Sequence, residues 1–246
     1  MRNRAIFDRD KEHFCILHKS DCYGEVFRLL GVLVDPKLIM EDEIRRIMHK
    51  SRPKIVAILQ TRSFYSLDGL LQQYKAHVLC ILEGSACAIY HAAQSHLSTL
   101  DDLQRRFVRK LGLNESEAFL RKGELAPLEL RRDIAVLGFL HKIQLGDVHP
   151  DLHGLFPRYI EPTTAPTRKA ARRHARQFRE QSGNSFYFKQ SLFGALAVYN
   201  FLPTYAVETT TVKAFQTLLT RDARPICEAQ VPGWHTMYNC RIRNWR

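Results

Sequence analysis

The stretch that decides the fold is residues 128–145, LELRRDIAVLGFLHKIQL. On a helix that turns about 100° per residue, its apolar side chains fall on nearly every side. A helix that is apolar all round is one that other elements bury. The sequence therefore predicts a mainly α-helical bundle built around residues 128–145.

An amphipathic helix is predicted just before this central stretch. Over residues 97–111 the apolar side chains recur at steps of three and four, which is the spacing of one helix face. Gly112 follows the last apolar position and is expected to end the helix. The opposite side of this helix carries four cations: Arg105, Arg106, Arg109 and Lys110.

Helices are also expected nearer the N-terminus. Residues 67–91 read as one long helix or two stacked ones, with Gly84 as the weak point. A further helix is predicted to follow Asp35 and Pro36, with Asp35 as its cap. Pro53 lies inside that pattern and should end or kink the helix, because proline has no amide hydrogen to donate.

Two segments at the start of the chain read as strands. Residues 12–18 and 25–34 are rich in β-branched and aromatic side chains, and a polar turn that ends at Gly24 separates them. This pattern predicts a β-hairpin with a long turn.

The region after the central helix is rich in Pro and Gly, and it leads into a second helical part. A helix is predicted over about 167–181 and another over about 209–220. The predicted organisation is a hairpin in 1–36, a helical bundle in 37–160, and a basic helix with a C-terminal extension in 161–246.

The composition indicates a packed, strongly basic protein. The 246 residues are 45% hydrophobic, and 37 Lys and Arg against 25 Asp and Glu give a net charge of +12. Such a charge favours polyanionic partners. The six Cys and the lack of a secretory segment predict free thiols and an intracellular location, nuclear or cytoplasmic, rather than secretion. The most apolar stretch, 76–93, is broken by charged and His residues, so no membrane span is expected.

The strongest functional signal is a basic stretch without any acidic residue. As a helix, it would present all its cations within an arc of about 140°. Like charges on one face repel unless a polyanion lies against them, so we expect nucleic-acid phosphates there. A solvated face is the alternative. The cations are Arg168, Lys169, Arg172, Arg173, Arg176 and Arg179, with Arg105, Arg106 and Arg109 as a second cluster.

A zinc site is not predicted. Cys227, His235 and Cys240 have the spacing of three ligands of a zinc knuckle, but Ala223 stands where the fourth would be. Three ligands leave a structural zinc site open, so we interpret the spacing as coincidence.

No catalytic residue is predicted either. The pair Asp101-Asp102 is similar to the magnesium-binding pair of polymerases, but it is interpreted as anions at the start of a helix. The chain has no Gly-rich phosphate loop and no Gly-x-Ser-x-Gly motif.

Four short motifs occur along the chain in a distinctive order. They are RLLGV with the following Asp35 (28–35), LQRRF (103–107), LELRR (128–132), and YNFLP with the following Phe215 (199–215). This order resembles the C-terminal part of non-LTR (LINE-type, jockey-like) reverse transcriptases. There the motifs mark the primer grip at the end of the palm, two helices of the thumb and its extension, and a closing signature.

The resemblance implies a non-catalytic C-terminal portion of an RNA-directed DNA polymerase, because the family's catalytic aspartates precede the first motif. Its thumb-like helices would clamp a template–primer duplex through phosphates. Leu30 and Gly31 would place backbone against the primer end. No cofactor is expected in this chain, since Mg²⁺ belongs to the complete polymerase.

Two other interpretations remain open. The chain could be a stand-alone α-helical module whose basic helix binds an acidic protein or a membrane surface. It could also be an active enzyme whose site the motifs do not reveal.

Overall fold

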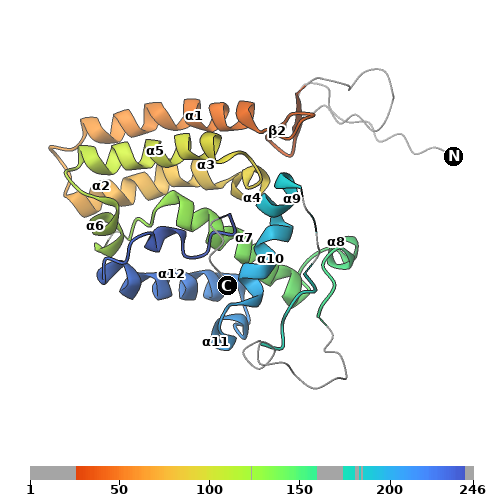
Figure 1. The fold of residues 1–246 in the computed structure, drawn as a ribbon. Helices are drawn as coiled ribbons and strands as arrows, with labels where there is room; N and C mark the ends of the chain where they lie inside the picture. The colour runs from red at the N-terminus through yellow and green to blue at the C-terminus, as the bar shows by residue number, and fades with distance from the viewer. Residues whose placement is uncertain (1–25, 123, 160–173, 181–182, 184, 242–246) are drawn as a thin grey trace.

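The computed structural model describes residues 26–122, 124–159, 174–180, 183 and 185–241. The described chain is mainly helical, with a short two-stranded antiparallel hairpin at its N-terminal end, as predicted (Figure 1). The elements are β1 (Phe27–Leu29), β2 (Val32–Val34), α1 (Glu41–Gln60), α2 (Leu67–Tyr74), the π-helix η1 (Lys75–Leu79), α3 (Cys80–Glu83), α4 (Ala86–Ile89), α5 (Gln94–Lys110), α6 (Glu115–Leu120), α7 (Leu128–Leu145), α8 (Pro150–Gly154), α9 (Phe186–Gln190), α10 (Leu192–Asn200), α11 (Thr204–Val207), α12 (Val212–Glu228) and the 3₁₀-helix η3 (Trp234–Thr236).

Helix α7 lies at the centre of the molecule, as its sequence predicts. In Figure 1, α1, α5 and α2 form a layer on one side of it, and α10 and α12 lie on the other. Leu128 belongs to the apolar cluster formed with the first layer, whereas Leu130 and Ile134 belong to the cluster formed with α10 and α12. Residues on both sides of position 160 therefore share one core through α7.

The predicted helices before α7 are confirmed with small shifts in their ends. Helix α5 covers Gln94–Lys110, and Gly112 follows it with a left-handed φ of 75°. The segment from Leu67 is helical to Glu83, passes through the π-turn η1, and breaks at Gly84 before α4. The weak point was therefore placed correctly.

Pro53 does not end α1, so the expectation of a helix end at this proline is wrong. The helix continues from Glu41 to Gln60 with Pro53 inside it. Proline removes one backbone hydrogen bond, but Ile47, Ile55 and Ile58 on the same helix are buried against the neighbouring helices. Burial of this apolar face on both sides of the proline outweighs the lost bond.

Asp35 caps a turn rather than the helix itself. Its carboxylate accepts hydrogen bonds from the amides of Ile39 at 2.9 Å and Met40 at 2.6 Å, and α1 begins one residue later at Glu41. Desolvation by itself would raise the pKa of Asp35, but these backbone donors lower it below the usual value.

The hairpin is shorter than predicted and lies entirely within residues 25–34, the predicted second strand. Phe27 pairs with Val34, and the chain reverses at Leu30 and Gly31, whose φ angles are 48° and 86°. Two consecutive positive φ values match the tight turns that twist with their strands, and glycine adopts such a φ without strain. The predicted first strand, 12–18, lies outside the described residues.

The predicted basic helix is wrong over its described part. Residues 174–180 are extended or bent, and Phe178 forms an antiparallel bridge with Arg158. Asn200 explains the difference, because its side chain accepts from the amide of Phe178 at 2.9 Å and donates to its carbonyl at 2.9 Å. A backbone held in this way has no helical hydrogen bonds to make. Residues 168–173 lie outside the described part of the chain.

The C-terminal helix is longer than predicted. Helix α12 begins at Val212 after the Thr211 cap, and it continues through Pro225 to Glu228. None of the helices in the described residues has the length and apolarity needed to cross a bilayer.

Candidate nucleic-acid interface

Of the basic stretch 168–179, two cations fall in the described residues, and they behave differently. The Arg176 guanidinium is half-buried and donates to the backbone carbonyls of Val207 at 2.8 Å and Thr209 at 3.5 Å. Arg179 is exposed, and no ion pair with another described residue holds it. Arg176 therefore joins two segments of the fold, and the predicted single face of cations is not formed here. Arg168, Lys169, Arg172 and Arg173 are outside the described residues.

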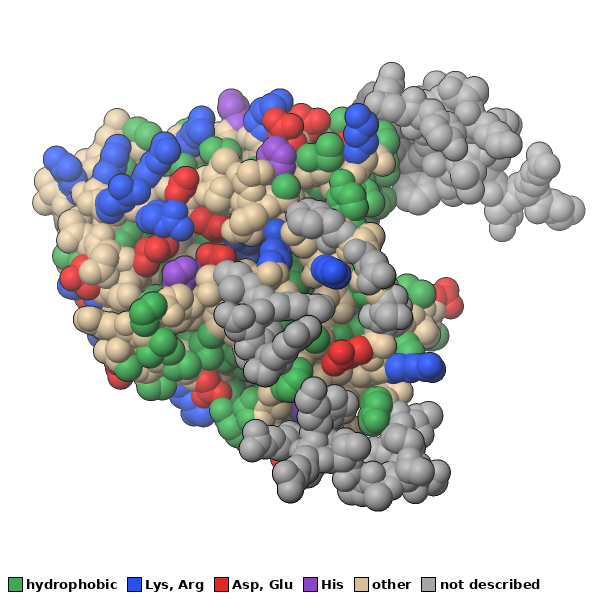
Figure 2. Space-filling view, in the orientation of Figure 1, with side chains coloured by type: hydrophobic (Ala, Val, Ile, Leu, Met, Phe, Trp, Pro, Cys, Tyr) green, Lys and Arg blue, Asp and Glu red, His purple; other side chains and the backbone are tan. Residues whose placement is uncertain are grey.

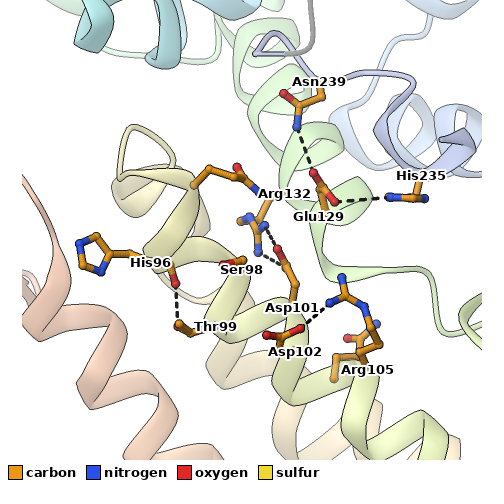
Figure 3. A network of polar contacts seen from close by, with 12 residues as sticks. His96, Ser98, Thr99, Asp101, Asp102, Arg105, Glu129, Arg132, His235 and Asn239 are labelled. Carbon is orange, nitrogen blue, oxygen red and sulfur yellow. Dashed lines mark hydrogen bonds and ion pairs between the residues drawn. The ribbon is translucent and has the colours of Figure 1, made fainter.

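An arginine of the third motif supplies the polar contact that joins α7 to α5 (Figure 3). Arg132 of α7 donates to both carboxylate oxygens of Asp101 in α5, at 2.7 and 2.8 Å. Only 3% and 4% of these two side chains is exposed. Asp101 lies in the middle of α5, which begins at Gln94, so its interpretation as a helix-start anion is wrong. Its carboxylate instead neutralises a buried arginine.

Three other motif residues also have partners within the fold. The Gln104 amide donates to the carbonyl of Ala126 at 2.8 Å. Arg105 pairs with Asp102 and, at 3.4 Å, with Glu115, while Arg131 pairs with Glu83. The carboxylates that surround Arg105 weaken its assignment to phosphate contact, because a phosphate would have to compete with them.

Arg106 and Arg109, by contrast, are exposed and have no partner among the described residues, and the same holds for Lys110. Arg52 on α1 and Arg62 just after α1 are likewise exposed and unpaired. Helices α1 and α5 pack against each other, and Arg62 and Lys110 line one cavity at their C-terminal ends. Figure 2 shows Lys and Arg side chains gathered along these helices at the upper left. We call Arg52, Arg62, Arg106, Arg109 and Lys110 the basic edge.

The sequence carries a signal for the α1 half of this edge. No acidic residue occurs between Glu43 and Asp68, although six Lys and Arg do. Asp68 itself pairs with Arg121 at 3.2 Å. Arg52 and Arg62 are too far apart in sequence to look like a cluster, and the packing of α1 on α5 places Arg62 at the same cavity as Lys110.

Exposed aromatic rings lie at the end of the basic edge, in the loop 61–66 between α1 and α2. Phe64 is 82% exposed and Tyr65 is 51% exposed. The loop backbone is held in place, because the Phe64 amide donates to the carbonyl of Thr61 at 2.9 Å. Tyr65, Arg62 and Lys110 line a cavity of about 430 Å³ beside it.

Leu30 and Gly31, the residues expected to resemble a primer grip, form the tip of the hairpin. Leu30 is 84% exposed, and a side chain added at Gly31 would meet nothing within 4 Å. The positive φ of Gly31 is a sufficient physical reason for glycine at this place. Its contact with a primer stays a prediction.

Helix α7 carries a buried acidic group, Asp133, close to the C-terminal residue Cys240. The Asp133 carboxylate accepts a hydrogen bond from the Tyr90 hydroxyl at 3.0 Å, and its second oxygen has no partner. Desolvation raises the pKa of Asp133 to about 7, although the Tyr90 hydroxyl and the nearby Arg132 oppose the rise. Asp133 is therefore a pH-sensitive point of the core.

The three residues with zinc-ligand spacing have separate environments. Cys240 lies 3.3 Å from the Tyr90 hydroxyl, whereas His235 is 3.8 Å from Glu129. Cys227 is buried within α12. In the described part of the chain, no three His, Cys, Asp or Glu side chains are placed to hold a metal ion together.

The chain was compared with protein-family models, curated proteins and solved structures, and none of them matches it.

Proposed function

We propose that this chain is a nucleic-acid clamp that holds a template–primer duplex by its phosphates, without polymerase chemistry of its own. In this proposal it corresponds to the thumb and C-terminal portion of a LINE-type reverse transcriptase. The observation that carries the proposal is the basic edge, whose five cations are exposed and unpaired among the described residues.

The contrast between paired and unpaired arginines supports this assignment. Arg105, Arg131, Arg132 and Arg176 make ion pairs or hydrogen bonds inside the fold, so their charges have local roles. The cations of the basic edge make no such contact with any residue that the structure describes. Arg106 and Lys110 are four residues apart on α5, which corresponds to about 6 Å along the helix axis. Duplex phosphates follow one another about every 3.4 Å along the duplex axis in each strand, so cations about 6 Å apart can meet phosphates about two steps apart.

The salt dependence of duplex binding tests the proposal. Neutralisation of five phosphates by the basic edge gives a slope of log K against log salt of about −4.5. Binding of a labelled duplex, measured by fluorescence anisotropy, should thus weaken about 500-fold between 50 and 200 mM salt, whatever the base sequence. Little affinity for duplex even at 50 mM salt would instead favour an acidic protein partner.

Two substitutions on α5 make the test specific to the basic edge. Arg106→Gln together with Arg109→Gln should reduce the slope by about 2, since each removes one phosphate contact. Arg45→Gln is the matched control. Arg45 is also an exposed arginine, but it lies on α1 and pairs with Glu41 at 2.6 Å. An unchanged slope in the double variant would move the contact elsewhere on the chain.

A further inference from the structure

Phe64 presents an aromatic ring to solvent at a place where it contributes little to the fold. With 82% of the residue exposed, it buries almost no apolar area. The ring is nevertheless well positioned, because the Thr61 hydroxyl bonds the Ile58 carbonyl at 2.8 Å and the Phe64 amide bonds Thr61. On the far side of the loop, the Ser66 hydroxyl caps α2 by accepting from the Gly69 amide at 3.2 Å. Hydrogen bonds therefore hold the backbone on both sides of the exposed ring.

The loop that carries this ring borders a cavity lined by two cations. Arg62 belongs to the same loop, and Lys110 approaches from the end of α5, so that both line the cavity beside Tyr65. Asp68 is the nearest acid along the chain, and its charge is already neutralised by Arg121. An exposed aromatic ring among cations fits a ligand that combines negative charge with flat rings, which describes an unpaired nucleotide.

The position of the loop along the basic edge specifies the ligand further. Helices α1 and α5 both end at the side of the molecule where the α1–α2 loop lies (Figure 1). A duplex that lies along Arg52, Arg106 and Arg109 would reach Phe64 at its end. From this geometry we propose that the loop 61–66 stacks on the first unpaired base beyond the duplex, with Phe64 as the stacking ring. The proposal rests on the proposed function, and it names the preferred ligand as a duplex with a single-stranded extension.

The experiment compares two labelled DNAs on the full chain: a blunt duplex of about 16 base pairs, and the same duplex with a four-nucleotide overhang. The wild-type chain should bind the overhang DNA at least about fivefold more tightly, which is the lower end of what stacking on one base contributes. Phe64→Ala should remove this preference and leave the affinity for the blunt duplex within about twofold. Phe64→Trp should keep the preference, because the larger ring also stacks.

A fluorescent base and a control variant separate stacking from general effects. 2-Aminopurine at the first overhang position should lose emission when it is bound by the wild type but not by Phe64→Ala. Phe201→Ala is the control, because Phe201 is also exposed, at 52%, but lies at the end of α10. Its affinity for both DNAs should equal that of the wild type.

The outcomes distinguish this inference from the proposed function. If the wild type binds both duplexes with the expected salt slope but equally well, or if Phe64→Ala keeps the preference, the stacking role is refuted and the clamp stands. If the wild type binds neither duplex, both proposals fail.

Discussion

Replacement of Arg132 by Met tests whether the motif arginines hold the fold together or touch phosphate. The two hydrogen bonds to Asp101, at 2.7 and 2.8 Å, connect side chains that are 3% and 4% exposed. Removal of one partner leaves a buried charge without compensation, which typically costs about 3–5 kcal/mol. For a chain of this size each kcal/mol lowers Tm by about 2–4 °C, so we expect a fall of roughly 6–20 °C.

The neighbouring residue provides the matched control. Arg131 pairs with Glu83, but these side chains are 26% and 31% exposed. A partly solvated pair contributes about 1 kcal/mol or less, so Arg131→Met should lower Tm by no more than about 4 °C. Asp101→Leu combined with Arg132→Met should recover most of the lost stability, because no unpaired charge remains.

The assay is thermal and urea unfolding followed by circular dichroism, together with duplex binding measured well below each Tm. If Arg132→Met and Arg131→Met have equal, small effects on unfolding, the interhelical role of Arg132 is wrong. Weakened duplex binding by Arg132→Met with unchanged stability would show that the motif contacts phosphate after all.

Three further predictions concern the core. The pKa of Asp133 is raised from 3.8 to about 7, so the folded state keeps a proton that the unfolded state loses as pH rises. The free energy of unfolding should therefore fall by about 3 kcal/mol between pH 5 and 8. Urea unfolding of Asp133→Asn should lack this pH dependence, and parallel pH profiles of the variant and the wild type would contradict the prediction. Asn200→Ala should lower the free energy of unfolding by at least about 2 kcal/mol, because it leaves both backbone groups of Phe178 unpaired; a loss below about 0.5 kcal/mol in the same assay would oppose this. Gly194→Ala should lower the free energy of unfolding by about 1–3 kcal/mol or more, because its methyl group would overlap the Lys189 carbonyl, whereas Gly154→Ala, in open space, should be neutral. Thermal melts of the two variants with equal Tm would refute the overlap.

The helical fold could be predicted because its signals are local. The apolar residues of 128–145 and the three- and four-residue spacing of 97–111 are properties of single helices, and both became buried helices at those places. The break at Gly84 was predictable for the same reason. In contrast, Pro53 was misjudged because local chemistry disfavours proline in a helix, and only the burial of residues on both sides of it decides the outcome.

The candidate site was less predictable, because pairing between distant residues determines which cations are available. Asp101 looked like a helix-start anion until α7 brought Arg132 against it, 31 positions further along the chain. Residues 174–180 have the composition of a helix, but the side chain of Asn200 holds their backbone in an extended form. No periodicity in the segment itself reports a partner that lies more than 20 residues away.

Asp101 of the buried pair and three cations of the basic edge lie on α5, and this connection allows their roles to be separated by thermodynamics. Asp101 anchors the buried face of α5, and Arg106 and Arg109 project from its exposed face. A duplex that binds only the folded state raises its stability by an amount fixed by the ratio of free duplex to Kd. If Arg132 only anchors α5, saturating duplex should raise the unfolding free energy of Arg132→Met as much as that of the wild type. In the Arg106→Gln, Arg109→Gln variant the increase should instead shrink, although its stability without duplex stays normal.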